Sequence, residues 1–150
     1  MQSSHADVDL SIHTAALQGN TVQLLARVNE GVNIDEKDET GNTALMISVE
    51  NNELSCFDLL LERKASPNAV NRGQPSALVI AARMGRRAMC WSLIKAGADL
   101  HAKSTYGNTA SQIALEKGFK SIAALLHNKL PQDSADWPVR VFLLIANFDC

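Results

Sequence analysis

The sequence predicts an all-α solenoid, built from helix-turn-helix units with short hairpin connections. Three observations predict it. A residue pattern recurs every 33 positions, small or apolar residues fill each unit, and glycines stand where helices should end. A fixed period of this size is typical of a repeat array, in which no unit can bury its apolar face alone and each one packs on its neighbours.

Residues 71–103 contain one complete unit. We expect a first helix from Ser76 to Arg83, a break at Gly85, a second helix from Ala88 to Lys95 and an exit at Gly97. Glycine suits the break and the exit because it adopts a left-handed backbone without steric cost. The same frame places the following residues at the start of first helices: Leu10, Thr43, Ser76 and Thr109.

These residues resemble the ankyrin repeat. The pattern of that family is met closely by residues 41–45 (GNTAL), by Ala81-Ala82 and by residues 97–102 (GADLHA). The sequence departs from this pattern at five positions. Ala26 and Arg27 stand where leucines are usual, and Lys64 and Gln74 stand where glycines are usual. Pro67 stands in the expected hairpin strand. The resemblance implies a polar lead over 1–9, four repeats over about 10–42, 43–75, 76–108 and 109–130, and a tail over 131–150.

The tail is unusually apolar. Eight of the ten residues from 139 to 148 are apolar, more than one face of a capping helix would use. An apolar patch of that size is rarely left exposed. We expect the tail either to cap repeat 4 or to form a contact, in a homodimer or a partner groove; a truncated or alternatively spliced end is a further alternative.

Composition excludes several classes of protein. With 150 residues and 46% hydrophobic content the chain can form one elongated domain, and it contains neither an export signal nor an apolar run of about 18 residues. Three cysteines argue against a disulfide framework, and Cys56 and Cys90 fall in second helices as expected core thiols. A reducing compartment, the cytoplasm or nucleus, fits best; a chain from a pathogen would be a secreted effector.

Charge is divided along the sequence. Residues 1–54 carry nine acidic and two basic side chains, whereas residues 55–130 carry eleven basic and four acidic ones. Because repeats stack in sequence order, these stretches form separate regions in space. They are either simply solvated ends or surfaces that steer a partner or a second copy of the chain. Nucleic acid is not expected, since the basic half lacks interleaved aromatic residues.

Residues for catalysis, a cofactor or a metal are not found in any usual spacing, and an enzyme is not expected. Four histidines are scattered, at His5, His13, His101 and His127. The resemblance implies a structural hydrogen bond for His13. It also implies possible hydroxylation of His101, because Leu93, Asp99 and Leu100 precede it as in ankyrin substrates of an iron-dependent asparagine hydroxylase.

The resemblance implies a non-enzymatic module that binds a protein partner through a concave surface of hairpin tips and first-helix ends. An adaptor or regulator is the leading function; a direct kinase inhibitor and a pathogen effector are the alternatives. The partner-binding candidates in these columns are Lys37, Glu39, Glu50, Asn51, Arg72, Arg83, Met84, Lys103, Thr105, Tyr106 and Asn108. Further positions in the same columns are Leu17, Gln18, Thr40, Asn42, Val70, Gly73, Pro75, Glu116 and Lys117.

Four of the candidates, Arg72, Arg83, Met84 and Tyr106, are of residue types that contribute most to interface energy. Trp91 is a rival contact residue, because its column lies on the outer face of the second helix. An exposed Trp91 would indicate binding on the convex side.

Overall fold

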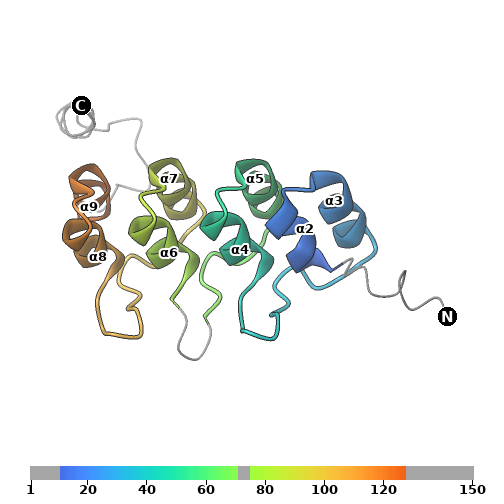
Figure 1. Ribbon diagram of the computed structural model, residues 1–150, viewed down its shortest axis with the longest axis horizontal. Coiled ribbons are helices and arrows are strands. Elements are labelled where there is room, and N and C mark those ends of the chain that lie inside the picture. The colour runs from blue at the N-terminus through green and yellow to red at the C-terminus, as the bar shows by residue number, and fades with distance from the viewer. Residues whose placement is uncertain (1–10, 71–74, 128–150) are drawn as a thin grey trace. The chain divides into compact units, whose positions relative to one another are not determined.

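The computed structural model describes residues 11–70 and 75–127. The described chain forms eight helices and divides into two compact units, Met1–Ser66 (unit 1) and Pro67–Cys150 (unit 2). In each unit, two helical hairpins stand next to each other, and a long loop projects away from the helices between them (Figure 1). The predicted all-α repeat fold is confirmed.

Unit 1 contains α2 (Ile12–Gln18), α3 (Thr21–Asn29), α4 (Ala44–Glu50) and α5 (Leu54–Glu62). First helices α2 and α4 pack together, as do second helices α3 and α5. Ala15 and Ala16 of α2 are fully buried, and small side chains let the neighbouring helix approach closely. Leu24, Phe57 and Leu60 complete the core on the second-helix side.

Unit 2 repeats this arrangement with α6 (Ala77–Arg83), α7 (Arg87–Lys95), α8 (Ala110–Glu116) and α9 (Lys120–His127). First helices α6 and α8 pack together, and second helices α7 and α9 do the same. The predicted helices from Ser76 to Arg83 and from Ala88 to Lys95 therefore match α6 and α7 to within one residue.

Each first helix begins at a hydroxyl side chain that caps its first turn. The oxygens of Ser11, Thr43, Ser76 and Thr109 each accept a hydrogen bond from the backbone N–H three residues ahead. The expected start at Leu10 is wrong by one residue. Leucine has no oxygen to accept this bond, so the next residue, Ser11, caps α2 instead.

Two non-glycine residues adopt the left-handed backbone that the repeat frame requires. Asn52 has φ 60°. Lys64, which stands in the column of Gly31 and Gly97, has φ 67°.

The second helix of repeat 1 forms although Arg27 occupies a column in which the next repeat has a leucine, Leu60. The Arg27 guanidinium stays half-exposed and pairs with Glu30 at 2.8 Å.

Cys56 and Cys90 are buried and free of disulfides, as predicted. Burial raises the pKa of the Cys90 thiol to about 12. Burial, followed by the negative charge of Glu53, also raises the pKa of Cys56. Both thiols therefore stay protonated, and a protonated thiol is a poor nucleophile.

Several predictions fall outside the described residues: the lead 1–9, Arg72, Gly73, Gln74 and the tail 131–150 with its possible homodimer contact at 139–148. The expectation that Pro75 lies at an exposed tip is wrong, because Pro75 is buried. It directly precedes Ser76, which is also buried and caps α6.

Candidate functional site

The hairpin tip of unit 1 is a closed, well-bonded turn over residues 37–43. Lys37 pairs with Thr43 in an isolated antiparallel bridge. The Asp38 N–H donates to the Asn42 carbonyl, and the Gly41 N–H donates to the Asp38 carbonyl, both at 2.9 Å. The Asp38 carboxylate also accepts from the N–H groups of Thr40 and Asn42 at 2.9 Å. Side chains on this tip are therefore held in fixed directions.

Asp38 is an ionised group at the centre of the tip. Burial acts to raise its pKa, but hydrogen bonds from Thr40 and Asn42 and the charge of His13 outweigh it, so the pKa lies below 3.8. His13 is itself fixed by its Nε2–H, which donates to the Glu36 carbonyl at 2.8 Å. This bond joins α2 to the hairpin, and it confirms the structural role expected for His13.

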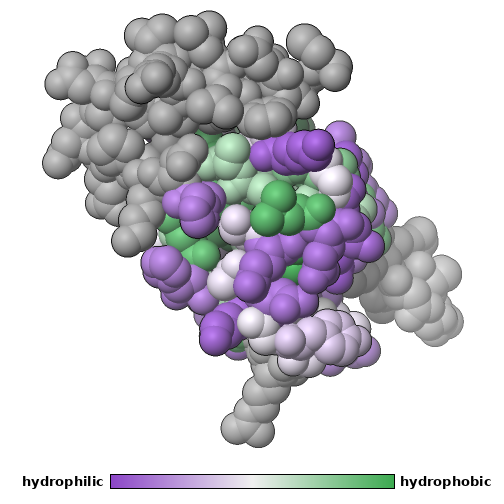
Figure 2. All heavy atoms as spheres, turned by 90° about the vertical axis from the view of Figure 1, so that its left-hand side faces the viewer, coloured by the Kyte–Doolittle hydropathy of each residue, from purple (hydrophilic) through white to green (hydrophobic). Residues whose placement is uncertain are grey.

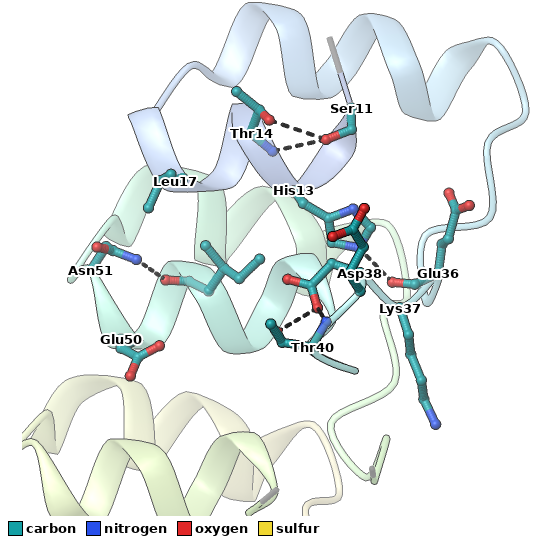
Figure 3. Close-up of a pocket in the computed structure, with 12 residues that line it drawn as sticks. Ser11, His13, Thr14, Leu17, Glu36, Lys37, Asp38, Thr40, Glu50 and Asn51 are labelled. Carbon is teal, nitrogen blue, oxygen red and sulfur yellow. Dashed lines mark hydrogen bonds between the residues drawn. The ribbon is translucent and has the colours of Figure 1, made fainter. Parts of the chain in front are cut away.

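A groove of about 650 Å³ lies between this tip and helices α2 and α4 (Figure 3). We call it the unit-1 groove. Leu17 and Ile47 give it an apolar part, with Leu17 52% exposed. Glu50 and Asn51, at the end of α4, lie across from the hairpin residues. Its complete lining is Ser11, His13, Thr14, Leu17, Glu36, Lys37, Asp38, Glu39, Thr40, Ile47, Glu50 and Asn51.

The structure brings the four predicted unit-1 residues together. Lys37, Glu39, Glu50 and Asn51 all line the unit-1 groove and are exposed. Six lining residues were not among the predicted contact positions: Ser11, His13, Thr14, Glu36, Asp38 and Ile47. The cluster of acidic residues at 36–39 is a visible signal for Glu36 and Asp38. His13 was expected to have a structural role only, and no sequence signal marks Ile47.

The hairpin tip of unit 2 has the same turn with different side chains. Lys103 pairs with Thr109 in an antiparallel bridge. Ser104 takes the place of Asp38, and its Oγ accepts from the N–H groups of Tyr106 and Asn108 at 3.3 Å. Tyr106 is 90% exposed although its backbone is held in this turn. An aromatic ring displayed in this way loses little conformational entropy on binding.

The other unit-2 candidates lie on the same tip or at the end of α6. Lys103 and Thr105 are exposed on the tip, and Asn108 is half-buried at its base. Arg83 ends α6 and Met84 follows it as the C-cap, 39% exposed. Trp91 is only half-buried rather than fully exposed, and the Lys95 Nζ lies 5.8 Å from its ring centroid.

Apolar side chains are exposed at the α8–α9 end of unit 2. In Figure 2 small apolar patches lie among hydrophilic side chains on the part of this face that is not grey. Leu115 of α8 is 59% exposed, whereas Ala82, one repeat earlier in its column, is fully buried.

His101 is exposed, and its backbone N–H donates to the Asp99 carboxylate at 2.9 Å. Hydroxylation at His101 stays a prediction, and the intact mass of protein from its native cell would test it. Within residues 11–70 and 75–127 no group of three or more His, Cys, Asp or Glu side chains is arranged to hold a metal ion. None of the helices in these ranges is both long and apolar enough to cross a membrane.

Repeated helical hairpins, hydroxyl caps every 32 or 33 residues and projecting tips identify the family. The family model described as "Ankyrin repeats (3 copies)" matches residues 4–71. The chain is an ankyrin-repeat protein. Its helices continue the same pattern through α9, consistent with four repeats.

Several curated relatives carry related arrays. Human ankyrin repeat family A protein 2 is 33% identical over 76 residues, which cover 51% of this chain and 24% of that protein. Mouse B-cell lymphoma 3 protein homolog is 31% identical over 105 residues, covering 69% and 23%. Human ankyrin repeat domain-containing protein 63 is 30% identical over 115 residues, covering 74% and 30%. The chain thus spans about a quarter of the length of these relatives. Ankyrin repeats generally mediate protein–protein interaction and are generally not enzymes.

Proposed function

We propose that this ankyrin-repeat protein is an adaptor or regulator that binds a protein partner through its hairpin tips and the ends of its first helices. The observation that carries the proposal is Tyr106, a 90% exposed aromatic side chain on a hydrogen-bonded turn. A large apolar residue in this position costs solubility without contributing to the core, and such residues are typical of interfaces. The cytoplasm or nucleus is the proposed location, which the free, buried thiols fit.

The partner is to be found by proximity labelling in the native cell and its binding measured with purified proteins. Arg83→Ala combined with Tyr106→Ala should weaken binding by about 2 kcal/mol or more, roughly thirtyfold. Thermal unfolding should hardly change, because both side chains are exposed.

Trp91→Ala is the matched control, since Trp91 belongs to α7, a second helix. It should leave binding intact. Loss of binding in Trp91→Ala alone would contradict the proposal and place the contact on the second-helix face. A panel of kinases assayed with and without the chain tests the alternative function, direct enzyme inhibition.

A further inference from the structure

We propose that the unit-1 groove binds a basic segment of a partner protein, with an arginine or lysine side chain among its carboxylates and an apolar side chain against Leu17 and Ile47. This inference rests on the proposed function and specifies the chemistry of one binding surface.

The lining of the groove has a strong excess of negative charge. The lining includes four acidic residues, Glu36, Asp38, Glu39 and Glu50, and one basic residue, Lys37. Asp38 remains ionised because its pKa is lowered below 3.8. A concave surface of one sign raises the local concentration of oppositely charged groups and accelerates their association.

Folding of the hairpin does not require this charge. The equivalent tip of unit 2 closes the same turn with Ser104, whose hydroxyl accepts from the N–H groups two and four residues ahead, as Asp38 does. The residues of unit 2 that correspond to Glu36 and Glu39 are Ala102 and Thr105, both uncharged. Glu36 and Glu39 are therefore additions to a turn whose counterpart in unit 2 forms without them, and a second acceptor type can replace Asp38 in closing it.

Backbone dipoles add to the attraction for a cation. Glu50 and Asn51 lie at the C-terminal end of α4, and Leu17 lies in the last turn of α2. The aligned peptide dipoles of a helix give its C-terminal end a partial negative charge. Leu17 and Ile47 lie in the same groove, so a long cationic side chain can pack its methylene groups on them while its charged end reaches the carboxylates.

Peptide binding measured by fluorescence anisotropy tests the inference. The probes are three labelled pools of 12-residue peptides that share leucine and alanine and differ in the rest: arginine and lysine, aspartate and glutamate, or serine and glutamine. The basic pool should bind at least about tenfold more tightly than the other two, and its binding should weaken as salt is raised.

Two double variants of equal charge separate the groove from the rest of unit 1. Glu36→Gln with Glu39→Gln removes two carboxylates from residues that line the groove, and binding of the basic pool should fall about tenfold. Asp58→Asn with Glu62→Gln removes two exposed carboxylates of α5, and binding should fall less than about twofold. Leu17→Ser, which leaves the charge unchanged, should also weaken binding. Urea midpoints of all variants show that the fold is retained.

Equal losses in the two double variants would overturn the inference, because attraction would then come from the overall charge of the unit. Absence of peptide binding while the partner still responds to Tyr106→Ala would overturn it and leave the proposed function standing. Sedimentation that shows a dimer, lost in the groove variant, would make a second copy of the chain the occupant and would also overturn it.

Discussion

Truncation of Leu93 tests the packing of the core of unit 2. Leu93 of α7 has no exposed surface, and Leu126, one repeat later in the same column, is buried in α9, which packs on α7. Leu93→Ala removes three carbon atoms from this core and leaves a cavity that α7 and α9 can only partly fill. The expected loss of unfolding free energy is about 2 to 5 kcal/mol, the usual range for a buried leucine.

Urea unfolding followed by circular dichroism measures this loss. With a slope of roughly 1.5 kcal/mol per molar urea, a loss of about 3 kcal/mol shifts the midpoint by about 2 M. Leu115→Ala is the control, because the same atoms are removed from a side chain that is 59% exposed. Its midpoint should move by less than about a third as much. An unmoved midpoint in Leu93→Ala would refute the register of α7.

Three other predictions follow from the described residues. Cys56 and Cys90 should resist iodoacetamide at pH 8 in the native protein and react in guanidinium, which peptide mass spectrometry would show; native labelling of either would contradict their burial. The pKa of Asp38 is lowered, so its ionised form stabilises the fold above about pH 4 and loses this effect as pH falls through the folded pKa. The stability difference between wild type and Asp38→Asn should therefore shrink in urea titrations from about pH 5 to pH 2, and a constant difference would contradict it. Lys64→Gly should raise the unfolding free energy by about 1 kcal/mol and Gly97→Lys should lower it by about as much, because both positions have left-handed φ and Gly97 has no neighbour within 4 Å of an added Cβ. Thermal midpoints that do not move in these directions would contradict it.

The helices and turns could be predicted from the sequence because the repeat constrains them in every unit at once. A single periodic frame places α6, α7 and the left-handed residues, and it holds even where Lys64 replaces glycine. The frame fails at Leu10 because a helix starts where a side chain can accept a hydrogen bond from the first turn. The 33-residue spacing alone does not show whether the residue at that position has such an acceptor.

The candidate site was less predictable because it depends on side chains from different segments. The columns correctly marked Lys37, Glu39, Glu50 and Asn51 as exposed, since exposure follows from position on a helix or tip. The groove itself arises where α2, α4 and the hairpin meet. The bond from His13 to the Glu36 carbonyl, which fixes the hairpin to α2, links residues 23 positions apart and leaves no local pattern.

The two hairpin tips show how this repeat separates folding from recognition. Asp38 and Ser104 accept hydrogen bonds from the same two N–H groups of their turns, so either side chain closes the tip. Only aspartate adds a charge. Because the backbone bonding is the same, the charge of a tip can change without a change of fold. A basic segment suited to the unit-1 groove would therefore find no such complement on the unit-2 tip, where Lys103 and Tyr106 favour an acidic or aromatic partner surface.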